Sequence, residues 1–178
     1  MKKGLTELIF VLDRSGSMSG LESDTIGGYN AMLEKQKKEA GEAVITTVLF
    51  DDQFELLHDR INLRGIASIT DKEYFVRGNT ALLDAVGKTI NKIGNAQQRT
   101  AEAERAEHVM FVITTDGMEN ASREFSYEKV RKMNIKKISM DGSLSFLAQT
   151  SMLLLPQNVL ASAKSGRQII MRIVREHR

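Results

Sequence analysis

The sequence predicts an α/β fold: a three-layer, Rossmann-like open sheet that is mainly parallel, is flanked by helices and has one antiparallel edge hairpin. Three features predict this class. The short apolar runs 8–12 and 109–113 each end in a polar cluster, which is typical of strands buried on both faces of a sheet. Apolar residues recur at helical spacing in segments that lie between the strands. The runs 43–50 and 54–63, joined by an acidic pair, predict the hairpin.

The first part of the chain gives a strand, a helix and the hairpin in turn. A strand is expected at about 5–12, and a helix at about 22–40, where apolar residues alternate with a charged face. The runs 43–50 and 54–63 follow as the paired strands. A short helix is expected near 71–74 within the polar stretch that comes next.

The second part of the chain continues the alternation. A strongly amphipathic helix is expected at 81–93, stopped by the Gly-Asn pair at 94–95. The charged segment 97–107 predicts an exposed helix or linker. A buried strand is expected at 109–113, and the polar residues 119–122 are typical of the cap that starts a further helix.

Composition narrows the classes of function. The 178 residues fit one domain, and 25 basic against 23 acidic residues give no reason to expect nucleic-acid binding. The chain has no cysteine, which excludes disulfides and thiolate metal sites. Its first apolar run is too short for a signal peptide or a membrane span. We therefore expect a cytoplasmic protein with no membrane association.

Oxygen-bearing side chains gather where the predicted strands end. Asp13, Ser15 and Ser17 alternate directly after the first strand, and Asp116 follows the strand at 109–113 in the same sense. Thr80 stands just before a predicted helix. Ligands of open α/β sheets bind outside the carboxyl ends of the strands, so these loops can meet at one edge and form a site. The alternative for the two serines is a capping role.

Three motifs resemble the metal-ion-dependent adhesion site of von Willebrand factor type A (vWA) domains, in the bacterial intracellular type. They are DRSGS at 13–17, GNTA at 78–81 and TTDG at 114–117. They occur in the family's order and structural contexts, over roughly residues 5–135. The three together carry the resemblance, since the first motif alone is weak.

The resemblance implies a role for each matched residue. Ser15 and Ser17 resemble the hydroxyls that bind the ion directly, and Asp13 and Asp116 resemble carboxylates that bind it directly or through water. Thr80 resembles the residue that joins the coordination shell when the site is engaged. Met18 is expected either to contact a partner or to pack beneath the first helix.

An all-oxygen donor set of this size suits Mg²⁺ or Mn²⁺ better than Ca²⁺. Only two carboxylates face the divalent ion, so an open coordination position favours a Glu or Asp side chain of a partner protein. The family is known for such recognition. The expected function is a non-catalytic, metal-dependent protein-interaction module. One alternative is a Mg²⁺-dependent hydrolase or phosphatase with Asp13 as nucleophile. The phosphatases that begin in this way resemble D-x-D, whereas this chain has Ser15 at the second position.

The resemblance stops after about residue 138, so we expect a vWA domain at 1–138 and an atypical tail at 139–178. Close family members continue with a strand and helix similar to YGWEFIFLGANIDA. Codons that encode residues 140–153 can spell that segment when they are read one base earlier. This relation predicts a one-base frameshift near residues 134–139.

A frameshifted tail was not selected to pack on this domain. Residues 143–148 are expected to imitate the lost edge strand, whereas 153–155 and the basic end are expected to pack loosely. A frameshifted product of impaired function is therefore a further alternative. The candidate site is built from residues 13–117, before the shift.

Overall fold

The apolar run near the N-terminus forms the centre of one sheet, as its lack of alternation predicts. The computed structural model describes residues 1–133, 144–147 and 168–174. Within them, six strands pair in the order β3-β2-β1-β4-β6-β5. The strands are β1 (Lys2–Asp13), β2 (Glu42–Phe50), β3 (Phe54–Asn62), β4 (Ala106–Thr114), β5 (Leu144–Leu147) and β6 (Gln168–Val174).

The strand directions confirm the predicted α/β class. Strand β1 is parallel to both of its neighbours, β2 and β4. Strands β2 and β3 form the antiparallel hairpin at one edge. On the other side of β4, the sheet continues with β6, which is antiparallel to β4 and to β5. The central strands thus form a Rossmann-like open sheet with parallel strands in its middle.

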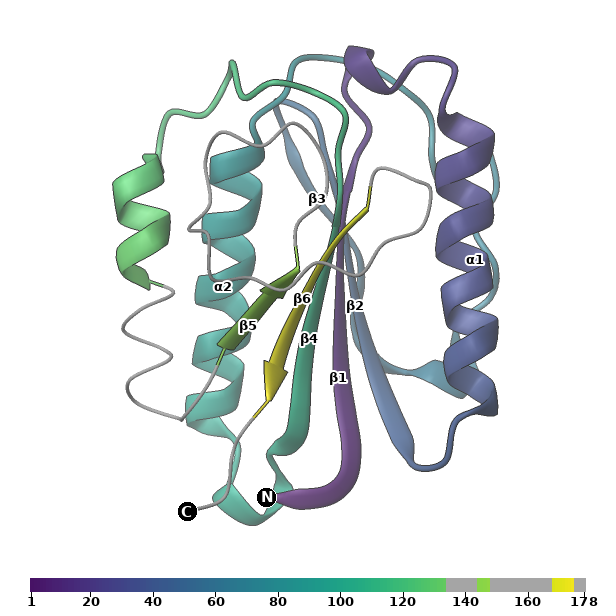
Figure 1. Cartoon of the computed structure of the whole chain (residues 1–178), viewed down its shortest axis with the longest axis vertical. Helices are drawn as coiled ribbons and strands as arrows, with labels where there is room; N and C mark the ends of the chain where they lie inside the picture. Colours follow the sequence, from purple (N-terminus) through teal and green to yellow (C-terminus); the bar gives the residue numbers. More distant parts are fainter. Residues whose placement is uncertain (134–143, 148–167, 175–178) are drawn as a thin grey trace.

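Helices cover both faces of this sheet, which gives the three predicted layers (Figure 1). The two long helices are α1 (Glu22–Lys38) and α2 (Leu82–Arg99). Alternate residues of β1 point to opposite faces. Ile9 shares a core cluster with Ile90 of α2. Phe10 faces α1, where its ring meets Tyr29 edge-on with centroids 4.8 Å apart.

Helix α2 is longer than the sequence predicts. It continues through the Gly-Asn pair at 94–95, which was expected to stop it, and ends at Arg99. A glycine inside a helix costs about 1 kcal/mol relative to alanine. Burial of the next turn offsets this cost, because Gln97 is buried and its amide donates a hydrogen bond to Glu7 of β1.

The segment near 71–74 forms a hydrogen-bonded turn and not the short helix that was expected. The backbone N–H of Tyr74 donates to the carbonyl of Thr70 at 3.0 Å, and no regular helix or strand follows until α2. The side chain of Tyr74 is buried, and its hydroxyl donates to the backbone carbonyl of Asp13. Anchoring this ring in the core ends the helical geometry after one turn.

The helix expected to start at residues 119–122 begins later. Residues 127–133 are helical, and Ser126 caps them by accepting a hydrogen bond from the backbone N–H of Lys129 at 3.3 Å. Glu119 caps a different helix, because its carboxylate accepts a bond from the N–H of Leu83 in α2 at 2.8 Å. The prediction that residues 119–122 cap the following helix is therefore wrong, because the residue that Glu119 caps, Leu83 of α2, lies 36 residues earlier in the chain.

Three short 3₁₀ helices complete the described elements. They are η1 (Gly16–Met18), η2 (Leu63–Gly65) and η3 (Glu102–Glu104). The charged segment 97–107 divides into the end of α2, η3 and the start of β4. Its exposed part fits the predicted linker.

Only two strands of the predicted tail at 139–178 are described. Strand β5 lies within the segment 143–148 that was expected to form an edge strand, and it occupies the edge of the sheet next to β6. Residues 153–155 and 175–178, for which loose packing was expected, lie outside the described residues.

A buried charge pair ties β1 to the helix layer and to the edge strand. Glu7 is fully buried in β1, and the Nε atom of Arg60 lies 2.9 Å from one of its carboxylate oxygens. Gln97 bonds the other oxygen. Burial raises the pKa of Glu7, and the charge of Arg60 and the Gln97 hydrogen bond only partly oppose this rise.

We predict that Glu7 makes the stability of the protein fall as the pH rises. Because the folded pKa lies above the reference value of 4.5, the folded state holds its proton more tightly than the unfolded chain does. The resulting stability is complete below the unfolded pKa and is lost as the pH passes the folded pKa. The free energy of unfolding, measured in urea relative to Glu7→Gln, should therefore decrease as the pH rises above the reference value of 4.5.

Glu39→Gln, at the exposed end of α1, is the matched control and should show no such trend. If the difference between the wild type and Glu7→Gln instead rises with pH, the ion pair with Arg60 outweighs the burial of the carboxylate.

Candidate metal centre

The loops that follow β1 and β4 meet because the two strands are parallel neighbours. Leu12 and Thr114 are paired in register, so the residues after them emerge side by side. The segment before α2 joins them, since the backbone N–H of Asn120 donates to the carbonyl of Thr80 at 3.0 Å. All three loops lie at the upper end of the sheet in Figure 1.

The hydroxyl of Ser15 lies within hydrogen-bond distance of two others, one from its own loop and one from the loop before α2. The Oγ atom of Ser15 is 2.9 Å from Oγ of Ser17 and 2.8 Å from Oγ1 of Thr80. Ser15 and Thr80 are buried, whereas Ser17 is exposed. The N–H of Gly16 donates to the carbonyl of Gly78 at 3.0 Å and holds the two loops together. The cluster therefore opens to solvent on the Ser17 side.

The carboxylate of Asp13 is fully buried beside these hydroxyls. Its Oδ1 accepts a hydrogen bond from the N–H of Ser15 at 2.7 Å, and its Oδ2 accepts one from the hydroxyl of Thr115 at 2.6 Å. Burial raises the pKa of Asp13, and these hydrogen bonds oppose the rise. Sequence reasoning gave Thr115 no role, although its place directly after β4, opposite Asp13, was the available signal.

The loop that carries Asp116 packs closely against the hydroxyl cluster. A Cβ atom on Gly117 would lie 2.4 Å from Oγ of Ser17 and 2.7 Å from Oγ1 of Thr80. Only glycine fits such a cradle. Asp116 precedes it and is partly buried. The structure thus brings Asp13, Ser15, Ser17 and Thr80 together and places Asp116 in the adjoining loop.

The donors gathered here fit a small, hard cation. They are hydroxyl and carboxylate oxygens, the ligands that Mg²⁺ and Mn²⁺ prefer. The described residues contain no group of three or more His, Cys, Asp or Glu side chains that could hold a metal ion. The present set differs from such groups in relying on hydroxyls, with Asp13 and Asp116 as its two carboxylates.

Glu119 and Asn120, in the loop that carries Asp116, anchor the start of α2 and the residue before it, Thr80. The side-chain oxygen of Asn120 accepts a bond from the N–H of Thr80 at 3.0 Å. Glu119 accepts from Leu83 and also from the N–H of Ser122 at 2.7 Å. Residue 81, at the start of α2, supplies no side-chain cap of its own. The loop after β4 therefore fixes the position of Thr80, a link that spans too many residues for sequence patterns to reveal.

Met18 is buried beneath the site, at 1% exposure. Of its two expected roles, this burial favours packing over a partner contact. A second methionine, Met118, stands exposed beside the centre.

A buried ion-pair cluster supports the first loop from below. The carboxylate of Asp51 is inaccessible to solvent and accepts bonds from Nε of Arg14 at 3.2 Å and Nε of Arg77 at 2.6 Å. Arg14 is also buried and donates to Glu55 at 2.7 Å. Asp51 was predicted to be a turn residue, and its bond from the N–H of Gln53 at 2.6 Å confirms this.

Burial alone would raise the pKa of Asp51. The hydrogen bond from Arg77, the N–H of Gln53 and the two guanidinium charges outweigh burial, so the net effect lowers the pKa. The carboxylate is thus ionised and matched to Arg14 and Arg77.

We predict that Asp51→Ala destabilises the fold by about 3 kcal/mol, because it leaves the buried guanidinium of Arg14 with only Glu55 as a counter-charge. Asp52→Ala is the matched control, since Asp52 is exposed and adjacent. Its effect should stay within about 0.5 kcal/mol. Urea denaturation measures both. Equal losses in the two variants would show that the buried cluster contributes nothing specific.

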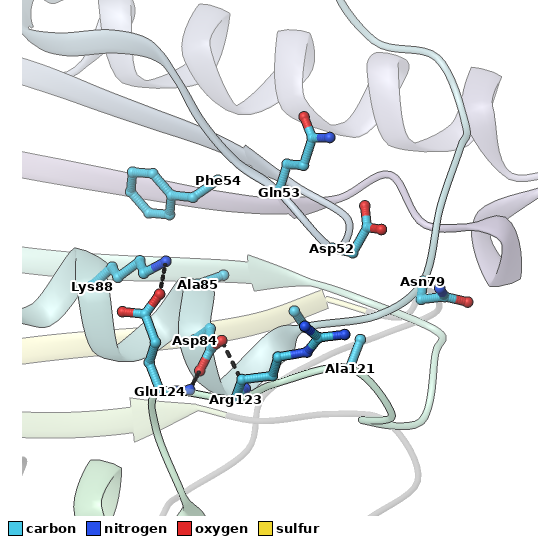
Figure 2. A pocket seen from close by; sticks show the side chains of 11 residues that line it. Asp52, Gln53, Phe54, Asn79, Asp84, Ala85, Lys88, Ala121, Arg123 and Glu124 are labelled. Carbon is cyan, nitrogen blue, oxygen red and sulfur yellow. Dashed lines mark hydrogen bonds and ion pairs between the residues drawn. The ribbon is translucent and has the colours of Figure 1, made fainter.

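A pocket of about 290 Å³ adjoins the centre on the α2 side (Figure 2). The carboxylate of Asp84 accepts three backbone N–H bonds there, from Arg123, Glu124 and Phe125, at 2.8–3.0 Å. Lys88 pairs with Glu124 at 2.7 Å. These groups hold the loop after Asn120 against α2. They therefore help to position the candidate site and do not form a second one.

Comparison with known proteins adds no family assignment. No protein-family model matches the chain, and no curated protein matches it. Among the described residues, no helix has the length and apolar character needed to cross a membrane. The functional proposal therefore rests on the geometry of the three loops and on the sequence motifs within them.

Proposed function

We propose that this chain is a non-catalytic protein-interaction module of the vWA type. In this proposal, a divalent cation, Mg²⁺ or Mn²⁺, is held by Asp13, Ser15, Ser17, Thr80 and Asp116, and binds a Glu or Asp of a partner protein. One observation carries the proposal: the Ser15 hydroxyl lies within 2.9 Å of hydroxyls from its own loop and from the loop before α2. Ordinary capping does not require this convergence.

In this proposal, some residues orient the ion's ligands, and the ion itself binds the partner's carboxylate. Thr115 and the N–H of Ser15 orient the Asp13 carboxylate, while Asn120 and α2 fix Thr80. The bound cation supplies a Lewis acid that attracts a carboxylate. Since Ser15, Ser17 and Thr80 contribute neutral oxygens, only two of the five proposed ligands are charged, and an acidic side chain can take an open coordination position on the ion.

The amino-acid composition agrees with a cytoplasmic location and with a partner that is not a nucleic acid. A chain without cysteine suits a reducing compartment such as the cytoplasm. The formal charge is +2, and basic and acidic residues are interleaved as far as residue 130, which gives no reason to expect nucleic-acid binding.

The alternative of a Mg²⁺-dependent hydrolase with Asp13 as nucleophile has less support. The phosphatases that begin with such a strand resemble D-x-D, and Ser15 stands where they carry the second carboxylate. A frameshift after residue 133 would leave every proposed ligand in place, so it would reduce stability before it removed the site.

Capture on the immobilised chain tests the proposal. From a lysate of the source cells, a partner should be retained in Mg²⁺ and lost in EDTA, because the ion forms the contact. Thr80→Ala should also lose it. Thr100→Ala, at the far end of α2, is the control and should retain it. Mass spectrometry identifies the bound proteins, and retention that is indifferent to Mg²⁺, EDTA and Thr80→Ala would contradict the proposal.

A further inference from the structure

Exposed apolar side chains border the candidate centre. Among the described residues, three large hydrophobic side chains are exposed: Ile61 at 41%, Phe75 at 45% and Met118 at 85%. Phe75 and Met118 belong to loops of the centre, whereas Ile61 lies on the edge strand β3. Apolar side chains exposed around a polar site are typical of protein interfaces.

Met118 is held at the rim by the loop that carries Asp116. It follows Gly117, whose backbone lies against the hydroxyls of Ser17 and Thr80. Two residues later, the N–H of Asn120 donates to the carbonyl of Thr80. The backbone on each side of Met118 is thus fixed beside the proposed ligands, while its flexible side chain remains in solvent and can adapt to a partner.

Phe75 is held at the rim by the segment before Thr80. Its neighbour Tyr74 donates a hydrogen bond to the carbonyl of Asp13, and the N–H of Arg77 donates to the carbonyl of Arg14 at 2.7 Å. The guanidinium groups of Arg14 and Arg77 each lie 5.6 Å from the centroid of the Phe75 ring. The ring is therefore positioned before any partner arrives, which lowers the entropy cost of binding.

We propose that the partner presents its acidic residue between apolar neighbours, which pack on Phe75 and Met118. This inference rests on the proposed function, since the ion anchors the acidic side chain. The charges agree with it: the side chain of Arg77, beside Phe75, is 42% exposed although its guanidinium also pairs with Asp51, and the proposed ion adds positive charge at the centre. The occupant is thus an acidic segment with apolar flanks in a partner protein, and not a strongly charged one.

Short synthetic peptides test this choice. The probes are Gly-Leu-Glu-Leu-Gly and Gly-Ser-Glu-Ser-Gly, acetylated and amidated so that Glu is their one carboxylate. Binding to the full chain in Mg²⁺ is measured by calorimetry. The leucine peptide should bind about tenfold more tightly, because its two side chains bury apolar surface on the rim.

Three variants locate the effect. The double variant Phe75→Ser with Met118→Ser should reduce the ratio between the two peptides to about one. Ile61→Ser removes a side chain of similar exposure away from the site and should leave the ratio unchanged. The substituted side chains are exposed, and thermal melting checks that the variants remain folded.

The outcomes separate the two proposals. Equal binding of both peptides, with binding still dependent on Mg²⁺ and lost when Glu is replaced by Gln, overturns the inference and leaves the proposed function standing. The same fall in ratio for Ile61→Ser also overturns the inference. Dimerisation of the free chain that Met118→Ser abolishes makes a second copy the occupant and overturns it too. Binding that survives EDTA, or no binding of either peptide, overturns the proposed function and the inference with it.

Discussion

The hydrogen bond from the Thr115 hydroxyl to the buried carboxylate of Asp13 joins two strand ends that are 102 residues apart in sequence. It exists because β1 and β4 are parallel and in register at their carboxyl ends. Burying a carboxylate is costly unless donors satisfy it, and Thr115 and the N–H of Ser15 supply them. The remaining cost appears as the raised pKa of Asp13. The Asp13 carboxylate is thereby held at the strand tip, at the centre of the proposed cation site.

Long-range side-chain bonds, and not local caps, set the loops around this point. The first turn of α2 receives its caps from Glu119 and Ser122, and Asp84 of the same helix holds the backbone of residues 123–125. Beneath the first loop, Arg14 is buried against Asp51. These bonds link the loop after β4, the start of α2 and the hairpin turn. Thr80 is thus held in place by bonds that come from other loops, which is what a preorganised site requires.

The sequence predicts the fold class and the convergence of the loops because both depend on local signals: buried apolar runs, helical spacing and polar strand tips. It misses features that depend on distant partners. The pair at 94–95 reads as a helix stop, but burial of Gln97 against Glu7 extends the helix. Glu119 has the chemistry of a cap, yet its partner Leu83 lies in another element. The position of Thr115 directly after a predicted strand is visible in the sequence, but its hydrogen bond to Asp13 depends on the β1–β4 register, which the sequence does not give.

A calorimetric titration with Mg²⁺ and Mn²⁺ tests the central claim that these loops form one cation site. The wild type should bind a single ion, and Asp13→Ala should lose this binding. Gly117→Ala should weaken it at least about tenfold, because its Cβ would enter the space between Ser17 and Thr80. Gly27→Ala in α1, where an added Cβ meets nothing within 4 Å, should bind as the wild type does. Equal affinity in the wild type and Asp13→Ala would contradict the account.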